Sequence, residues 1–148
     1  MRTDPIVPVV ERWHGVLRNR MEGLEGLLHP DCTFLSPIVF TPQEGRDITM
    51  LYLQAAGNTL AAPAEGSGGG SEPGTGAFRY VKQVLDGHHA VLEFETVVEG
   101  ISVNGVDIIT CDDDGLIVEF KVMLRPLKAV NKVHEQMKAM LEHMQSGG

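Results

Sequence analysis

The alternation of apolar and polar residues over 89–126 constrains the fold more than any other feature of the sequence. It has a period of two and runs through three stretches separated by turn-forming residues, which is typical of successive antiparallel strands. Alternating residues of a strand point to opposite faces of a sheet. The inward face of the first stretch consists of Leu92, Phe94, Thr96 and Val98. We therefore predict a three-stranded antiparallel meander with one face against a core.

The middle stretch, GVDIITC at 105–111, breaks this pattern. Asp107 falls on the same face as Ile109 and Cys111, so a carboxyl group stands in the middle of an apolar face. Burying an unpaired carboxylate is costly, and we expect Asp107 either to have partners, such as the Trp13 indole, or to serve a function. The last stretch returns to alternation, with an inward face of Val118, Phe120, Val122 and Leu124.

Composition limits the class of protein. The chain has 148 residues, of which 43% are hydrophobic, and this predicts one globular domain over 1–148. It has no apolar run long enough to span a membrane, and its first residues lack the pattern of a secretory signal, so we expect a cytoplasmic protein without membrane contact. The net charge of −8 disfavours binding to nucleic acid, which requires clustered Lys and Arg.

Metal sites and cofactors are not expected. Cys32 and Cys111 lie apart in apolar surroundings, which favours buried free thiols. His88 and His89 are adjacent near a strand end and point to opposite faces, so they make a poor metal site. The acidic segment 112–114 lacks the spacing of a calcium-binding loop and is predicted to be a solvated turn. We predict neither a metal site nor a cofactor.

The rest of the chain predicts helices, two further strands and one loop. Apolar residues at helical spacing predict a first helix that ends near Arg20. The further elements are a short helix over 21–28, a strand over 32–35, a helix over 44–60, a strand over 78–85 and a helix from Pro126. The segment 61–76, AAPAEGSGGGSEPGTG, predicts a flexible loop, because it has few side chains that can bury area. Its GSGGGS core resembles an engineered linker, and a natural low-complexity insertion fits equally well.

The sequence resembles the nuclear transport factor 2-like superfamily, in particular its SnoaL-like and ketosteroid-isomerase-like members. Four segments carry the resemblance: ERWHGVLRN, LLHPDCTFLSP, EGRDI and NGVDIITCDDDGLIVEFKVMLRPL. It implies an α+β fold, in which helices wrap a cone-shaped, curved and mostly antiparallel sheet, also described as a cystatin-like α+β barrel. The resemblance further implies a deep pocket in the cone and, in many members, a homodimer through the outer face of the sheet.

The resemblance to ketosteroid isomerases carries over only in part. The carboxyl group at the position of Asp107 is protonated in that family and donates a hydrogen bond to the substrate oxyanion. The position of the family's catalytic base is occupied by Ser36, and that of its tyrosine, allowing a one-residue gap, by Trp13. A serine without an activating partner cannot remove an α-proton, and an indole donates a hydrogen bond without transferring a proton. Ketosteroid isomerisation by that mechanism is therefore not expected.

We expect a small apolar molecule in the cone, with Asp107 as the catalytic or polar centre. The expected ligand-binding residues are Trp13, Phe34, Ser36, Tyr52, Leu92, Phe94, Ile109, Phe120 and Val122. Some side chains have two interpretations: Trp13 either anchors the core or clamps a ligand, and Tyr52 and Tyr80 either close the pocket or simply pack. His14 is either a base in the pocket or a surface residue.

Three functions remain open. The first is an acid-base enzyme, such as an isomerase, cyclase or hydratase, that acts on a small apolar substrate. The second is a binding protein with the same pocket and no catalysis. The third is a protein-interaction or dimerisation module that uses the sheet. Val106, Ile108 and Thr110, with Val97 and Met123 beside them, form an apolar outer face, from which we predict a homodimer.

Overall fold

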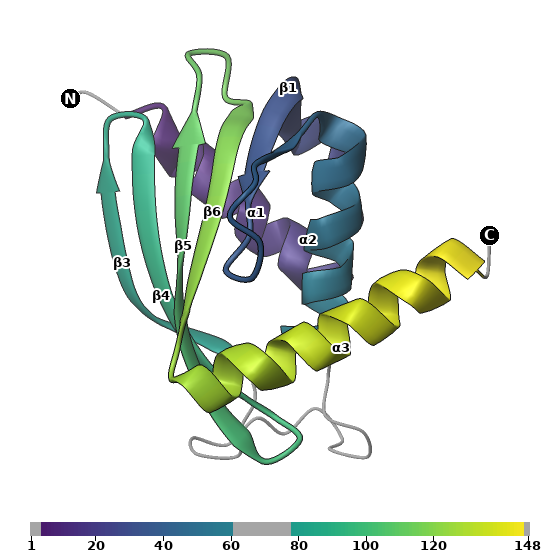
Figure 1. Ribbon diagram of the computed structural model, residues 1–148. Helices are drawn as coiled ribbons and strands as arrows, with labels where there is room; N and C mark the ends of the chain where they lie inside the picture. Colours follow the sequence, from purple (N-terminus) through teal and green to yellow (C-terminus); the bar gives the residue numbers. More distant parts are fainter. Residues whose placement is uncertain (1–3, 61–77, 147–148) are drawn as a thin grey trace.

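The computed structural model describes residues 4–60 and 78–146 (Figure 1). The predicted loop over 61–76 lies outside the described residues. The elements in chain order are α1 (Ile6–Arg18), a 3-10 turn η1 (Glu25–Leu27), β1 (Leu28–Leu35), β2 (Gln43–Glu44), α2 (Arg46–Leu60), β3 (Arg79–Asp86), β4 (His89–Val98), β5 (Ile101–Cys111), β6 (Ile117–Arg125) and α3 (Leu127–Ser146).

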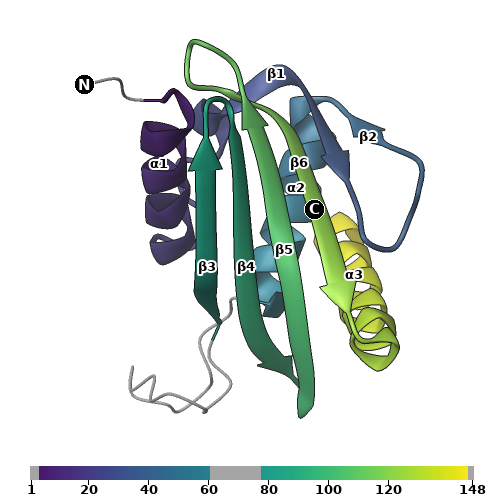
Figure 2. The ribbon, with the colours of Figure 1, turned by 90° about the vertical axis from the view of Figure 1, so that its left-hand side faces the viewer.

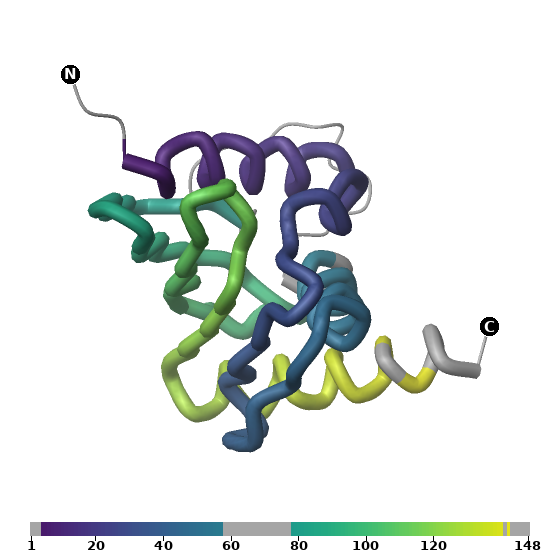
Figure 3. The backbone as a smooth tube through the Cα atoms, turned by 90° about the horizontal axis from the view of Figure 1, so that it is seen from above, coloured from purple at the N-terminus to yellow at the C-terminus, as the bar shows by residue number. Residues whose placement is uncertain are grey.

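The strands form one curved six-stranded sheet in the order β2-β1-β6-β5-β4-β3 (Figures 1 and 2). β1 and β6 run parallel, and the other neighbouring pairs run antiparallel. The helices close the hollow of this sheet: α1 contacts β3, β4 and β5, α2 contacts β1, and α3 contacts β5 and β6. Viewed from above, α2 lies between α1 and α3 (Figure 3). This arrangement confirms the predicted α+β fold with a curved, mostly antiparallel sheet.

The predicted meander is confirmed in β4, β5 and β6, with one correction. The predicted inward face of β4 is buried along its length, and Asp107 is buried on the same face as Ile109 and Cys111. In β6, however, Ile117 is buried and Val118 is only half-buried, so the prediction of an inward Val118 is wrong. The reason is a register shift after Thr110, which pairs Cys111 with Ile117 and leaves Val118 as an extra residue.

The segment before β1 also differs from the prediction. A helix was predicted over 21–28, but only one turn of 3-10 helix forms, because the backbone is left-handed at Arg20, Met21 and Gly23, with φ 55°, 68° and 91°. β1 begins at Leu28 rather than at residue 32, since Leu28 pairs with Ile117 of β6. A register shift follows Leu28, and the His29 Nδ1 atom accepts a hydrogen bond from the Asp31 amide at 2.9 Å. The two-residue strand β2 was not predicted.

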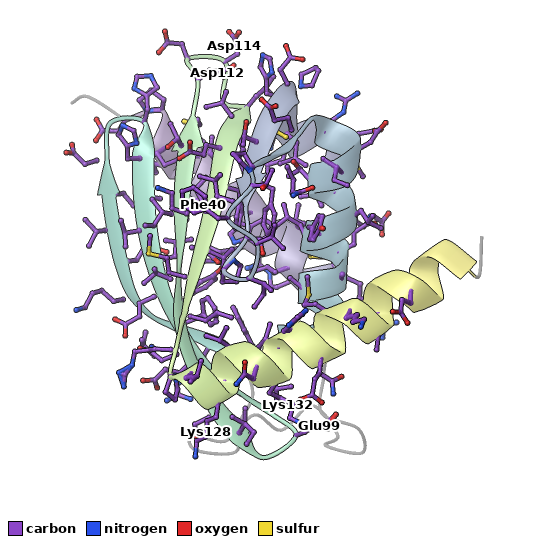
Figure 4. All side chains as sticks on the ribbon, viewed as in Figure 1. Phe40, Glu99, Asp112, Asp114, Lys128 and Lys132 are labelled. Carbon is purple, nitrogen blue, oxygen red and sulfur yellow. The ribbon has the colours of Figure 1, made fainter. Side chains whose placement is uncertain are left out.

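Helix α3 is fixed to the turn between β4 and β5, where it crosses the end of the sheet (Figures 1 and 4). Lys132 Nζ lies 3.6 Å from a carboxylate oxygen of Glu99, and the Gln136 amide donates a hydrogen bond to the same carboxylate. Ala129 and Val133 of α3 are buried in a cluster with Phe94. These contacts hold the helix against the lower part of the sheet. None of the helices described in residues 4–60 and 78–146 is long and apolar enough to cross a membrane.

Candidate functional site

A cavity of about 340 Å³ lies between the sheet and the helices. Its walls come from all three helices and from strands β1, β3, β4, β5 and β6. Most of the lining is apolar, and its buried aromatic and aliphatic members include Trp13, Phe34, Leu53, Phe94, Phe120, Val122 and Val133. A cavity of this volume is within the range of small-molecule sites in proteins.

The structure places seven of the nine expected ligand-binding residues in the cavity lining. They are Trp13, Phe34, Ser36, Tyr52, Phe94, Phe120 and Val122. The remaining two, Leu92 and Ile109, are fully buried in the core cluster to which α1 contributes Ile6 and Val9. They point inward as alternation predicts, but the cavity lining does not include them. Alternation identifies the inward face of a strand, whereas the helix packed on that face decides which part of it stays open.

Asp107 lies in the cavity wall with its carboxyl group hydrogen-bonded to Tyr80. The Tyr80 hydroxyl donates to Asp107 Oδ2 at 2.5 Å, and the Trp13 indole Nε1 donates to the Tyr80 hydroxyl oxygen at 2.9 Å. The Trp13 indole, named above as one candidate partner of Asp107, does not bond it directly, because Tyr80 lies between them. The three residues come from α1, β3 and β5 and form a chain of two hydrogen bonds at the edge of the cavity.

Burial controls the protonation of Asp107 and Tyr80. Asp107 is 6% exposed, and loss of hydration raises the pKa of its carboxyl group from 3.8 to about 7, although the hydrogen bond from Tyr80 acts in the opposite direction. Burial also raises the pKa of Tyr80 well above 10, and the negative charge of Asp107 adds to this effect. Tyr80 therefore keeps its proton at neutral pH, while Asp107 is present in both the neutral and the charged form.

The role of Tyr80 was missed because it depends on an irregularity in β3. The pairing of β3 with β4 shifts between Tyr80 and Lys82, so the strand carries one extra residue at Val81. This bulge allows Tyr80 to point toward Asp107 while Gln83, three residues later, still reaches His14 of α1. Strict alternation would place Tyr80 and Gln83 on opposite faces. No residue type in this strand signals the bulge.

Two other candidates have structural contacts of their own. The Ser36 hydroxyl oxygen accepts hydrogen bonds from the amides of Ile38 and Val39, at 3.0 and 3.4 Å, and so closes a turn after β1. Tyr52 stacks on Phe34, with ring centroids 5.4 Å apart. Among residues 4–60 and 78–146, Ser36 therefore has no hydrogen-bond partner that could make it a base, although it lines the cavity.

His14 does not line the described cavity. Its Nε2 atom lies 3.0 Å from the Gln83 amide oxygen, and its ring packs edge-on against Tyr80 at 5.3 Å. The histidine thus supports Tyr80 from the side of α1. Neither the base nor the surface interpretation describes it fully, because it is half-buried beside the hydrogen-bonded chain.

The histidines and aspartates at the top of the sheet stabilise turns. His88 Nε2 lies 2.6 Å from Asp113 Oδ1. Asp112, labelled in Figure 4, accepts hydrogen bonds from the amides of Asp114 and Leu116 through Oδ1, as an aspartate does when it closes a turn. Among residues 4–60 and 78–146, no three His, Cys, Asp or Glu side chains are grouped so that they could hold a metal ion.

Exposed residues of the cavity lining form its mouth. On α3 these are His134, Lys138 and Glu142, which are spaced by four residues and so share one face of the helix. The loop after β1 contributes Val39, and the next residue, Phe40, which is labelled in Figure 4, is fully exposed. The cavity thus has an apolar interior with one buried carboxyl group and a polar rim along α3.

Solved structures resemble this chain over most of its length. A steroid delta-isomerase from Pseudomonas aeruginosa has 30% sequence identity and a TM-score of 0.83, and the match covers 97% of this chain and 96% of that chain. An uncharacterized protein with a cystatin-like fold from Silicibacter pomeroyi also has 30% identity, with a TM-score of 0.74 and coverage of 89% and 84%. A nuclear transport factor 2-like protein of unknown function from Mesorhizobium loti has 18% identity, a TM-score of 0.65 and coverage of 85% and 98%. No protein-family model and no curated protein sequence matches the chain.

Proposed function

Since the chain belongs to the nuclear transport factor 2-like superfamily, we propose that its cavity binds a small apolar molecule through a carbonyl oxygen, to which Asp107 donates a hydrogen bond. The observation that carries this proposal is a buried carboxyl group in an otherwise apolar wall. A pKa of about 7 leaves much of Asp107 protonated at neutral pH, and a neutral carboxylic acid can donate a hydrogen bond. The relative named a steroid delta-isomerase supports an apolar ring compound as the ligand.

Such a donor would stabilise negative charge on the carbonyl oxygen when a proton leaves the neighbouring carbon. This chemistry fits an isomerase, a cyclase or a hydratase. It requires a base as well as an acid. The carboxylates in the described lining are Asp107 and Glu142, and Glu142 is exposed at the mouth. By its resemblance to ketosteroid isomerases, Ser36 falls at the position of that family's base, and its hydroxyl oxygen accepts a hydrogen bond within a turn. These two facts favour a second candidate, a binding protein that does not catalyse a reaction.

The carbonyl proposal can be tested with two probes of nearly equal shape, acetylnaphthalene and isopropenylnaphthalene, in which the carbonyl oxygen is replaced by a methylene group. At about pH 5.5, where Asp107 is protonated, we expect the ketone to bind roughly fivefold more tightly, because one hydrogen bond contributes about 1 kcal/mol. Isothermal titration calorimetry measures both affinities. The preference should disappear in Asp107→Leu. Equal binding of the two probes to the wild type would reject a carbonyl-binding site.

Catalysis is distinguished from binding by proton exchange. If Asp107 stabilises the enol of acetylnaphthalene, solvent water accepts a proton from the methyl carbon while the carbonyl oxygen gains the acid proton of Asp107, and the reverse steps in D2O return a deuteron to that carbon and to Asp107. We expect NMR to show faster exchange with the wild type than with Asp107→Leu. Ketone binding without any acceleration would favour the non-catalytic candidate.

A homodimer through the outer face of the sheet is the second part of the proposal. On this face Val97 and Met123 are 41% and 51% exposed, and Val106 and Ile108 beside them are half-buried. Exposed apolar patches of this kind favour association with a second copy. We expect sedimentation at micromolar concentration to show a dimer and Met123→Glu to shift it toward monomer. Leu127→Glu, at an exposed position on α3, is the matched control and should leave the dimer intact. A monomeric wild type would contradict the prediction.

A further inference from the structure

The two hydrogen bonds that join Trp13, Tyr80 and Asp107 have a fixed direction. An indole N–H can only donate, because the ring nitrogen has no free lone pair. The Tyr80 oxygen, 2.9 Å from Trp13 Nε1, must therefore accept from it. A phenol has a single proton, and the hydroxyl of Tyr80 directs it to Asp107 Oδ2 at 2.5 Å. Asp107 Oδ2 consequently accepts the hydrogen bond from the Tyr80 hydroxyl.

This direction decides which oxygen of neutral Asp107 holds the acid proton. A protonated carboxyl group has one O–H donor. Since Oδ2 already accepts from Tyr80, the proton of the neutral acid belongs on Oδ1. Among residues 4–60 and 78–146, Tyr80 is the residue that hydrogen-bonds the Asp107 side chain, and Asp107 lines the cavity. The acid proton on Oδ1 is thus left for a bound molecule.

We propose that Trp13 is a positioning residue: by donating to Tyr80, it keeps the Tyr80 proton on Asp107 Oδ2 and makes Asp107 Oδ1 the single hydrogen-bond donor that the buried chain offers to a ligand. Without the indole N–H, the Tyr80 oxygen could accept the acid proton of Asp107, and the donor would be lost to the cavity. The site then selects ligands whose buried polar atom is an acceptor, such as a ketone oxygen, over ligands that present only a donor. The ligand class rests on the proposed function, whereas the hydrogen-bond direction does not.

Few other titratable groups face the hydrogen bonds that join Trp13, Tyr80 and Asp107. On the side of α1, His14 packs against the Tyr80 ring. Those of α3 that line the cavity are at its mouth: His134, Lys138 and Glu142. None of these four side chains hydrogen-bonds Asp107 or Tyr80 among the described contacts, so a change at Trp13 reaches Asp107 through Tyr80.

The test removes the indole N–H and keeps the shape of the ring. Trp13 is the single tryptophan of the chain, so biosynthetic replacement by benzothienylalanine, in which sulfur replaces N–H, alters this position alone. Fluorotryptophan, which keeps the N–H, is the matched control. Trp13→Phe is a second variant, because it also lacks the donor and retains an aromatic ring against Phe120, whose centroid lies 4.9 Å from that of Trp13.

The first readout needs no ligand. Carbon-13 NMR of the labelled Asp107 carboxyl group should show a higher pKa with benzothienylalanine or Trp13→Phe than with fluorotryptophan, since the neutral acid gains Tyr80 as an acceptor and the Tyr80 hydroxyl becomes a weaker donor to the carboxylate. An unchanged or lower pKa in both variants would overturn the proposal.

The second readout is the preference for acetylnaphthalene over isopropenylnaphthalene at about pH 5.5, which should fall roughly threefold or more in the variants. An unchanged preference would overturn the role of Trp13 in ligand selection. A wild type without any preference would instead reject the proposed function, and the NMR titration would still decide the hydrogen-bond direction. The two failures are therefore distinguishable.

Discussion

Asp107→Asn is expected to stabilise the protein above pH 7 by up to roughly 4 kcal/mol relative to the wild type and to change stability little near pH 4. A rise of the pKa from 3.8 to about 7 means that the fold disfavours the charged carboxylate. The stability contributed by the neutral acid is present below pH 3.8 and is lost as the pH rises to about 7, because the folded protein binds more protons than the unfolded chain over this range. At about 1.4 kcal/mol per pH unit, the loss is roughly 4 kcal/mol. Asparagine is neutral at every pH and avoids it.

Urea unfolding of the wild type and the variant between pH 4 and pH 8.5 measures this difference. Asp114→Asn is the control, because Asp114 is exposed in the turn between β5 and β6, and its curve should run parallel to that of the wild type. A difference of the opposite sign, with the wild type gaining stability over the variant as the pH rises, would contradict the prediction. It would show that donors such as Tyr80 depress the pKa of Asp107 and that the carboxylate anchors the fold.

Gly105→Ala is expected to destabilise the protein by about 3 kcal/mol and to weaken ligand binding. A methyl group at this position in β5 would lie 2.5 Å from Phe94 Cζ, 2.7 Å from Leu124 Cδ2 and 2.7 Å from the Met123 carbonyl oxygen. The carbonyl oxygen belongs to the backbone of the paired strand β6 and cannot rotate away. Overpacking of this kind typically costs about 1–3 kcal/mol, and here two side chains and a strand must move together.

The variant should also alter the cavity, since Phe94 forms part of its wall. Urea unfolding and the affinity for acetylnaphthalene measure the two effects. Gly15→Ala is the matched control: the added methyl group would have 3.8 Å to its nearest neighbour, and alanine favours a helix such as α1 by about 0.5–1 kcal/mol over glycine. We expect the two substitutions to have opposite signs. A neutral Gly105→Ala would mean that β5 and β6 can separate without loss of stability.

Two features of the protein bear on its function: its similarity to known structures and the residues of its cavity. Similarity to solved structures over nearly the whole chain establishes the superfamily, and one of those structures is a steroid delta-isomerase. The residues around the cavity then support the proposed hydrogen-bond donor at Asp107 and give no carboxylate base at position 36, which is a serine. The experiments with the ketone and its alkene analogue separate binding from catalysis, because the two affinities test the donor and proton exchange tests catalysis.

The sequence by itself determined the meander and the position of Asp107 on its inner face. Side chains alternate along a strand with a period of two, so a shift of register by one residue would bury the polar face of β4 and expose Phe94. The cost of burying polar residues and exposing apolar ones therefore determines which face each side chain is on, whatever the position of the helices. The same local logic predicted α1, α2 and α3 from apolar residues at helical spacing, with boundaries that differ from the structure by only a few residues.

Only the tertiary structure decided what surrounds Asp107. The bulge at Val81 brings Tyr80 to the carboxyl group, and the packing of α1 fills the space over Leu92 and Ile109 while the cavity stays open beside Phe94. Both depend on contacts between elements distant in the chain: Tyr80 and Asp107 are 27 residues apart, and Trp13 and Tyr80 are 67 apart. A bulge costs little locally and is stabilised by such distant contacts, so no pattern of neighbouring residues reveals it.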